Sequence, residues 1–282
     1  DHYHPWNSEQ GQSAFVWTVL GALAEATSDL RVATAVTCPT VRIHPAVIAQ
    51  AAATTAAMFE GRFLFGVGSG EALNEHILGD PWPPADIRLG MLEEAIELIR
   101  ALWTGDTVTR VGRHYRVEQA KLWTRPEEPP PILVSGFGPK AVDLAARIGD
   151  GYCTTGPDEE LISRFRSNGG GDKLVQAGMK VCYGPDEAEA VKTVTRIWPN
   201  ESLPGELAQV LPTPPHFEQA CSLVTEEMIA ESVPCGPDLD RHAEAIKEYA
   251  DAGVDELYVQ QIGGGHDRFF EAYARDILPR FS

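Results

Sequence analysis

Short apolar runs alternate with amphipathic stretches along the whole chain. Six of these runs end in glycine, threonine or a polar cluster, and a helix-like stretch follows each. They are Leu30–Thr37, Arg62–Gly68, Pro131–Gly136, Gly151–Thr155, Met179–Tyr183 and Glu256–Ile262. This alternation is typical of βα units around a parallel sheet. It predicts an α/β fold in which the residues after the strands meet on one face, as in a (β/α)8 barrel.

Helical periodicity is clearest in Ile87–Trp103, where apolar residues recur at three- and four-residue steps and Gly105 follows as a stop signal. Asp106–Leu122 alternates like a small hairpin. Asp240–Ala250 and Arg268–Leu278 are predicted to be the helices before and after the last strand.

The amino-acid composition does not change along the chain, and no linker separates regions of different composition. A chain of 282 residues suits one large α/β domain. We therefore expect a single barrel domain over residues 1–282, with ordered excursions that shape a substrate mouth. These excursions are expected at about 106–128, 157–178 and 199–232.

The charge balance excludes several classes of partner. The formal net charge of −18 argues against nucleic acid or an anionic membrane surface, because both need clustered basic residues. Five scattered cysteines without a CxxC pair are typical of thiols in a reducing cytosol. The sequence thus favours a cytoplasmic protein that acts on a small molecule.

Two glycine-bearing segments follow predicted strands. In Gly66–Asn74, three glycines permit close backbone approach by a ligand, or simply a tight turn, and Glu71 lies where the next helix begins. In Val134–Pro139, free N–H groups at a helix start would bind phosphate, and Lys140 adds a positive charge. An ordinary capped turn is the alternative there.

The segment Asp1–Trp6 places two histidines beside a carboxylate. Acid–base chemistry is attractive for His2, because imidazole titrates near neutral pH. A surface loop with incidental histidines is an open alternative. A metal site would need a third ligand at matching spacing, and none is evident.

Taken in order, three segments closely resemble the coenzyme F420-dependent glucose-6-phosphate dehydrogenase family of the bacterial luciferase-like superfamily. They are Asp1-His2-x-x-Pro5-Trp6, then Val36-x-x-Pro39-Thr40-x-Arg42-x-x-Pro45-Ala-Val-Ile-Ala-Gln50, then Gly66-Val-Gly-x-Gly70-Glu-Ala-Leu-Asn-Glu75. The resemblance covers nearly the whole chain and weakens between about 157 and 230. It implies a luciferase-like (β/α)8 TIM barrel, a homodimer, and two βα elements before Asp1, so that this chain lacks the first two strands.

The resemblance also implies a site. Its catalytic set is His2, Trp6 and Glu71, with His2 and Glu71 sharing the proton transfer and the N1 side of the deazaflavin ring. Val36 follows an expected non-prolyl cis peptide, and Cys38 stands where the family has threonine. The residues implied to contact coenzyme F420 are Asp1, Val36, Cys38, Ser69, Gly70, Asn74, Gly136, Phe137, Gly138, Lys140 and Ala141.

One departure from the family pattern bears on the substrate. The sugar-phosphate enzymes bind the substrate phosphate with two lysines and an arginine, which suit a dianion. Pro157 or Asp158, Ala208 and Ser232 stand at those places here, with Glu231 adjacent. We therefore expect an F420-dependent dehydrogenase or reductase acting on a CH–OH group other than that of glucose-6-phosphate.

Two other classes of function remain open from the sequence. A flavin mononucleotide-dependent luciferase-like monooxygenase could use the same barrel. A non-catalytic binding protein is the third alternative, and it predicts a chain that binds neither cofactor.

Overall fold

The computed structural model describes residues 1–281, and the chain divides into two compact units. The first unit comprises residues 1–3, 13–153 and 164–174. The second comprises residues 4–12, 154–163 and the chain from 175 onward. Every candidate site residue except Trp6 belongs to the first unit.

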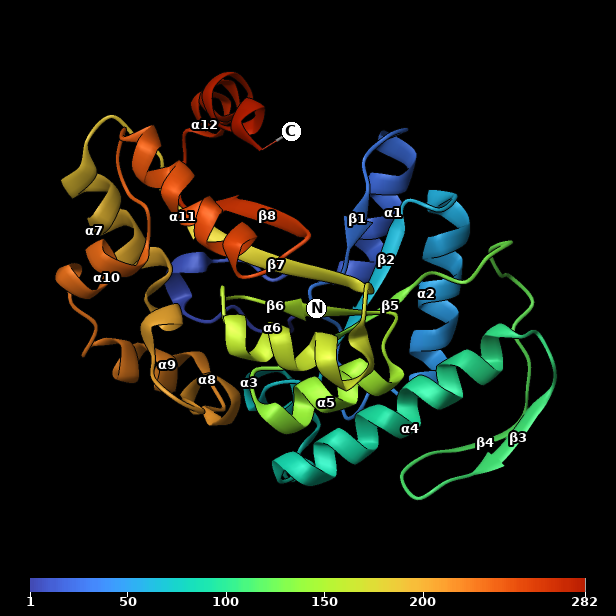
Figure 1. The fold of residues 1–282 in the computed structure, drawn as a ribbon. Coiled ribbons are helices and arrows are strands. Elements are labelled where there is room, and N and C mark those ends of the chain that lie inside the picture. Colours follow the sequence, from blue (N-terminus) through green and yellow to red (C-terminus); the bar gives the residue numbers. More distant parts are fainter. Residues whose placement is uncertain (282) are drawn as a thin grey trace. The chain divides into compact units, whose positions relative to one another are not determined.

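Parallel strands form the centre of the first unit (Figure 1). They are paired in the order β1-β2-β5-β6, so the chain adds strands in sequence along the sheet. Their bounds are β1 (Val32–Ala33), β2 (Phe63–Val67), β5 (Ile132–Ser135) and β6 (Gly151–Thr154). All of β2 is buried, as a parallel strand covered on both faces should be.

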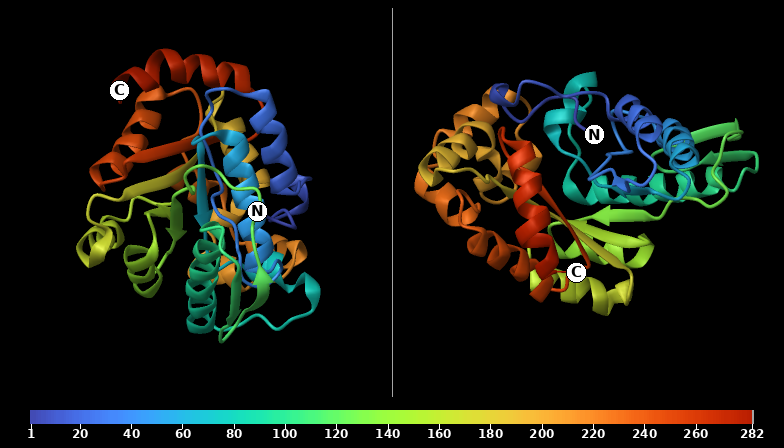
Figure 2. Two further views of the ribbon diagram at one scale, coloured as in Figure 1. Left: turned by 90° about the vertical axis from the view of Figure 1, so that its right-hand side faces the viewer. Right: turned by 90° about the horizontal axis from the view of Figure 1, so that it is seen from above.

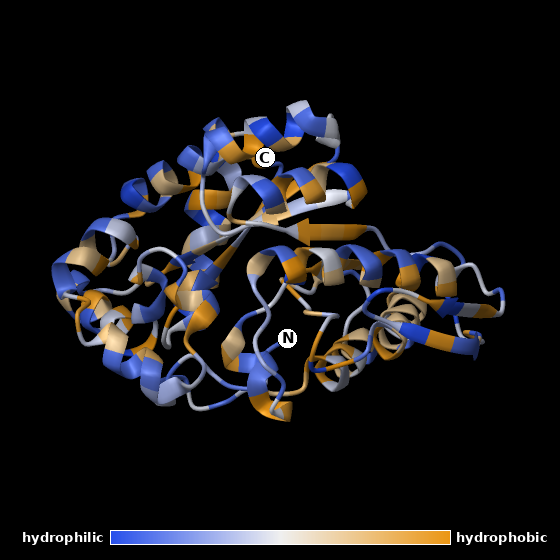
Figure 3. Cartoon of the chain, turned by 90° about the horizontal axis from the view of Figure 1, so that it is seen from below, coloured by the Kyte–Doolittle hydropathy of each residue, from blue (hydrophilic) through white to orange (hydrophobic). Residues whose placement is uncertain are grey.

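One helix precedes β1 and others follow β1, β2 and β5, and they pack as neighbours in chain order: α1 on α2, α2 on α4, and α4 on α5. Hydrophobic and hydrophilic residues alternate along many of the helical ribbons (Figure 3), as expected of helices with one side on a core. Aromatic rings of β2 meet the helices, since Phe65 lies 5.9 Å from Trp103 between ring centroids. The helices are α1 (Val16–Ala26), α2 (Pro45–Phe59), α3 (Ala72–Glu75), α4 (Ala85–Trp103) and α5 (Pro139–Ile148).

The predicted hairpin is confirmed as the antiparallel pair β3 (Val108–Val111) and β4 (Arg116–Ala120). Its turn is held by Glu94 of α4, whose carboxylate accepts main-chain N–H bonds from residues 113, 114 and 115. A Cβ at Gly112 would lie 1.8 Å from Glu94 Oε1, so only glycine fits there.

The second unit is built on the parallel pair β7 (Leu174–Val181) and β8 (Glu256–Gln261). Met179 and Val181 of β7 pack in a buried cluster with Tyr249, Phe269 and Tyr273. The carboxyl-terminal helix α12 and its continuation lie against α11 (Figure 2). The helices are α6 (Glu159–Phe165), α7 (Glu187–Ile197), α8 (Leu207–Val210), α9 (Pro214–Cys221), α10 (Glu226–Ser232), α11 (Leu239–Asp251) and α12 (His266–Ala272).

The predicted α/β class with parallel strands is confirmed, and all six predicted strands are present. One boundary is wrong: β7 begins at Leu174, inside the segment expected as an excursion over 157–178, and α6 fills the earlier part of it. Three consecutive glycines, Gly169–Gly171, obscured that strand's start. The segment 199–232 is also mostly helical. Among residues 1–281, no helix is both long and apolar enough to cross a bilayer.

Candidate functional site

The candidate site of the first unit lies where β1 and β2 end. The peptide Ala35–Val36 is cis, as the resemblance implies. Just beyond it, Thr37 pairs with Val67 at the end of β2. The main-chain nitrogen of Asp1 donates to the Val36 carbonyl over 3.3 Å, which brings the start of the chain to the same place.

The three glycines after β2 make room for the protein's own backbone and side chains. A Cβ at Gly66 would lie 1.9 Å from the Thr34 carbonyl oxygen, and one at Gly68 would lie 2.7 Å from Val36. Gly70 has a φ of +79°, and a Cβ there would lie 2.5 Å from Cys38 Sγ. The close approach predicted for this segment is therefore one of chain to chain, around the cis peptide.

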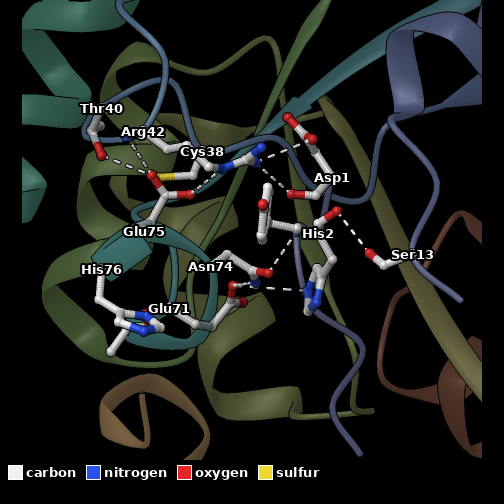
Figure 4. Close-up of polar contacts among 12 residues, drawn as sticks. Asp1, His2, Ser13, Cys38, Thr40, Arg42, Glu71, Asn74, Glu75 and His76 are labelled. Atoms are coloured by element: carbon white, nitrogen blue, oxygen red, sulfur yellow. Dashed lines mark hydrogen bonds and ion pairs between the residues drawn. The ribbon is translucent and has the colours of Figure 1, made fainter. Parts of the chain in front are cut away.

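His2 and Glu71 face each other across this turn (Figure 4). His2 Nε2 lies 3.9 Å from Glu71 Oε2, and each side chain is 29% exposed. This separation is too long for a hydrogen bond but close enough for the two groups to act on one bound molecule. The predicted meeting of imidazole and carboxylate is thus present within the first unit.

Asn74 and Ser13 hold these two residues in place. Asn74 Nδ2 donates to Glu71 Oε2 over 3.3 Å, and the Asn74 side-chain oxygen accepts the Tyr3 main-chain N–H over 2.8 Å. The Ser13 hydroxyl donates to the His2 carbonyl over 2.8 Å. Glu71 itself is the residue before α3, so its side chain leaves a fixed helix start.

A buried ion network that the sequence did not indicate lies beside His2 and Glu71. Arg42 Nη2 lies 3.2 Å from Asp1 Oδ1 and donates to the Asp1 carbonyl over 2.9 Å. The Arg42 main chain donates to Glu75 Oε2 over 2.7 Å, and its Nε lies 3.4 Å from Glu75 Oε1. All three side chains are almost fully buried. Both Arg42 and Glu75 stand in the motifs quoted above, but nothing in their spacing shows that they meet.

Burial sets the protonation of two further groups here. Burial raises the pKa of the Glu75 carboxyl, and the bonds from Arg42 oppose that rise. Burial also raises the pKa of the Cys38 thiol strongly, with the nearby Glu75 charge adding to it. The raised pKa favours the neutral thiol, and Cys38 Sγ lies 3.0 Å from the Thr40 hydroxyl.

The predicted phosphate turn has the expected shape. Pro139 opens α5 at its first position, with Gly138 as N-cap. A Cβ at Gly136 would lie 2.7 Å from the Ala141 methyl group, so glycine lets the strand end pack on the helix start. Lys140 forms an exposed ion pair with Asp86 at 2.8 Å, so its charge is partly offset. Phe137 is 55% exposed.

Trp6 belongs to the second unit. Its ring packs edge-on against Phe217 of α9, with centroids 5.0 Å apart. Its main-chain N–H donates to the Gln10 side chain, and Gln10 Nε2 donates to the Ile197 carbonyl over 3.0 Å. The indole is therefore fixed by aromatic packing.

The residues present fit a bound deazaflavin. Both carboxylate oxygens of Asp1 are buried; Oδ1 lies 3.2 Å from Arg42 Nη2 in an ion pair, but neither oxygen accepts a hydrogen bond from a group among residues 1–281. Buried acceptors of this kind ordinarily have a donor. A ring N–H or hydroxyl of a ligand beside Val36 would supply it. The open space around Gly138, where a Cβ would meet nothing within 4 Å, suits a phosphate at the start of α5.

Comparison with known proteins shows which family this chain resembles in sequence and fold. The family model for luciferase-like monooxygenases matches residues 1–256. The chain is 37% identical to an F420-dependent glucose-6-phosphate dehydrogenase of Segniliparus rotundus, covering 99% of this chain and 87% of that protein. A protein of the same description from Microbacterium testaceum is also 37% identical, with the same coverage.

The solved structures agree. An F420-dependent secondary alcohol dehydrogenase, in complex with an F420-acetone adduct, superposes with a TM-score of 0.92 at 28% identity. That match covers 100% of this chain and 88% of the other. A coenzyme F420-dependent tetrahydromethanopterin reductase from Methanopyrus kandleri shares the fold, with a TM-score of 0.78 at 21% identity. On its sequence and its fold, this chain belongs to the luciferase-like monooxygenase family, beside the F420-dependent dehydrogenases within it.

Proposed function

We propose that this chain is an oxidoreductase that uses coenzyme F420 to transfer a hydride to or from a CH–OH carbon. The opposed His2 and Glu71 side chains, 3.9 Å apart beside the buried Asp1 carboxylate, carry this proposal. The F420-dependent relatives at 37% identity support it independently.

Different residues of the chain would bind the ring and the phosphate of the coenzyme. Asp1 would accept a hydrogen bond from the ring, and Val36 would press against it from the cis peptide. Cys38, Ser69, Gly70 and Asn74 would line the ring. The coenzyme's phosphate would sit at the start of α5, on the segment Gly136–Ala141.

When bound, the deazaflavin supplies the hydride-accepting or hydride-donating carbon. A side chain of the protein must then accept or donate the hydroxyl proton of the substrate. His2 Nε2 or Glu71 Oε2 takes that proton in oxidation and returns it in reduction, while the other group faces the ring. Acid–base help of this kind is worth about 10²–10⁴ in rate. The resemblance implies that Trp6 would line the substrate pocket.

We further propose that glucose-6-phosphate is a poor substrate. The second unit has a pocket of about 520 Å³ that is lined by Pro157, Ser232 and Glu231, among others. None of the three places at which the resemblance puts the cations of the sugar-phosphate relatives carries a cation here. Two of these places, Pro157 and Ser232, line the pocket beside Glu231, whose carboxylate disfavours a dianion.

A cofactor titration tests the proposal. Purified protein should bind F420 with a change in its absorbance and should bind flavin mononucleotide weakly. A screen of alcohols and carbonyl compounds for absorbance change of F420 then identifies the substrate and the direction. Tight flavin mononucleotide binding without F420 binding would instead favour the monooxygenase alternative, and size-exclusion chromatography tests the expected homodimer.

A further inference from the structure

The pocket of the second unit is lined by one lysine, Lys180, whose charge is balanced by a neighbouring glutamate. Its wall includes Lys180 near the end of β7, and the Lys180 ammonium lies 3.2 Å from Glu201 Oε1. The lysine side chain is only 13% exposed. It also lies over the Trp198 ring, 5.7 Å from its centroid, and Trp198 Nε1 donates to Glu201 Oε2 over 3.0 Å. Glu201 is thus held in place beside Lys180.

The remaining wall is acidic, hydroxylated or apolar. Glu231 lines the pocket, and no ion pair is seen for it among residues 1–281. With one cation and two carboxylates, the formal charge of the lining is −1. The other lining residues are Thr155, Gly156, Pro157, Met179, Ser202, Met228, Ser232, Val233 and Tyr249.

The place of the pocket identifies it as a ligand site. Thr155, Gly156 and Pro157 directly follow the last residue of β6, and Met179 and Lys180 lie near the end of β7. In parallel α/β folds, ligands bind beyond the carboxyl ends of the strands. Tyr249 stiffens this edge because its hydroxyl donates to the Thr155 carbonyl over 3.0 Å.

We propose that Glu201 is a specificity-determining residue that turns this pocket away from phosphorylated substrates and toward uncharged hydroxyl compounds. The inference rests on the proposed function and names its substrate class. Without Glu201, Lys180 would be a largely buried ammonium suited to a phosphate dianion. With Glu201 in place, a dianion would have to compete with a bonded carboxylate and approach Glu231 as well.

The test is a gain of function in Glu201→Gln. Glutamine can still accept the Trp198 N–H bond, so the loop keeps one of its anchors. Calorimetric titration with inorganic phosphate at pH about 8, where the ion is a dianion, should show binding strengthened by roughly fivefold or more over the unchanged protein. The turn before α5 contributes equally to both titrations, so only the difference between the two proteins counts.

Two variants localise the effect. In the double variant Lys180→Gln/Glu201→Gln, the gain should disappear, because the ammonium that binds the ion is gone. Glu244→Gln makes the same change of charge on an exposed position of α11, outside the pocket, and should leave phosphate binding unchanged. A gain that also appears in Glu244→Gln, or that survives in the double variant, would overturn the proposal.

Glu231→Gln gives a second measurement should Glu201→Gln fold poorly. It removes the other carboxylate and should give a smaller gain, again dependent on Lys180. No gain in any folded single variant overturns the inference. A turnover assay separates this outcome from failure of the proposed function. If none of the alcohols tested allows the unchanged protein to reduce F420, the dehydrogenase assignment fails. The phosphate titrations still decide the role of Glu201 in that case.

Discussion

At the scale of single residues, the site depends on groups that are held by their neighbours. Glu71 is oriented by Asn74, and His2 by the Ser13 hydroxyl at its carbonyl. The Ser13 contact is made to the His2 main chain, whereas the Asn74 amide donates to Glu71 Oε2, the same oxygen that faces His2 Nε2. Their proximity was predicted from the resemblance, whereas the residues that orient them were not.

Glu71→Gln and His2→Asn test the proton transfer. Each should lower kcat for F420-linked alcohol oxidation by roughly tenfold or more, because the group that receives the proton is lost. F420 affinity should stay within a few-fold of the unchanged protein. Rates near that of the unchanged protein in both variants would remove these residues from the chemistry.

Arg42→Met tests the buried ion network. Removal of the guanidinium leaves the Asp1 and Glu75 carboxylates buried without their cation, which costs about 3–5 kcal/mol in free energy of unfolding. Urea denaturation measures the loss. Lys192→Met removes an exposed partner of Glu189 and serves as the control, with an expected change below about 1 kcal/mol. Similar losses in both variants would show that the Arg42 network is no stronger than a surface pair.

At the scale of elements, the junction after β2 explains why the glycine segment has its sequence. Thr34 and Val36 lie against the end of β2: a Cβ at residue 66 would overlap the Thr34 carbonyl oxygen, and a Cβ at residue 68 would overlap the Val36 side chain. The segment was open to two interpretations from the sequence, ligand approach or a tight turn. The structure gives a third reason for the glycines: the atoms that would clash with a side chain at these positions belong to the segment that follows β1.

Gly68→Ala should therefore be overpacked. Its methyl group would meet Val36 at about the 2.7 Å found for an added Cβ, and overpacking of this kind costs about 1–3 kcal/mol. Weaker F420 binding should accompany the loss, because Val36 is proposed to touch the ring. Gly184→Ala, where an added Cβ meets nothing within 4 Å, is the matched control for thermal stability.

Glu94 gives the hairpin a pH dependence. Burial tends to raise the pKa of its carboxyl, but the main-chain N–H bonds from residues 113–115 outweigh that effect and lower it. A lowered pKa in the folded state means that the stabilisation is present above the ordinary glutamate pKa and is lost as pH falls through the lower value. The Glu94→Gln variant should lose about 1–3 kcal/mol at neutral pH.

The pH profile supplies the check. The difference in unfolding free energy between the unchanged protein and Glu94→Gln should shrink in acid, below pH about 4. Glu97→Gln, on the same helix with a half-exposed carboxylate, should change the free energy of unfolding by less than about 1 kcal/mol. A difference that grows on acidification would contradict the assigned direction of the shift.

At the scale of the whole molecule, the net charge of −18 is the dominant long-range feature. Like charges in excess repel one another in the compact state, and salt screens that repulsion over about 10 Å at 0.1 M. The thermal midpoint should therefore rise between low salt and about 0.15 M sodium chloride. Choline chloride should act equally, whereas a rise with sodium alone would indicate specific ion binding.

The sequence by itself determined the α/β class, the six parallel strands and the long helices, because hydrophobic periodicity and glycine stop signals are local properties of the chain. Its motifs also predicted that His2 and Glu71 lie together and that a glycine-bearing turn precedes α5. Only the tertiary structure decided that Arg42 joins Asp1 to Glu75, and that Glu201 neutralises Lys180. These pairs lie 33, 41 and 21 residues apart. Pairing of charges at such separations depends on how the strand ends meet, and no local pattern records it.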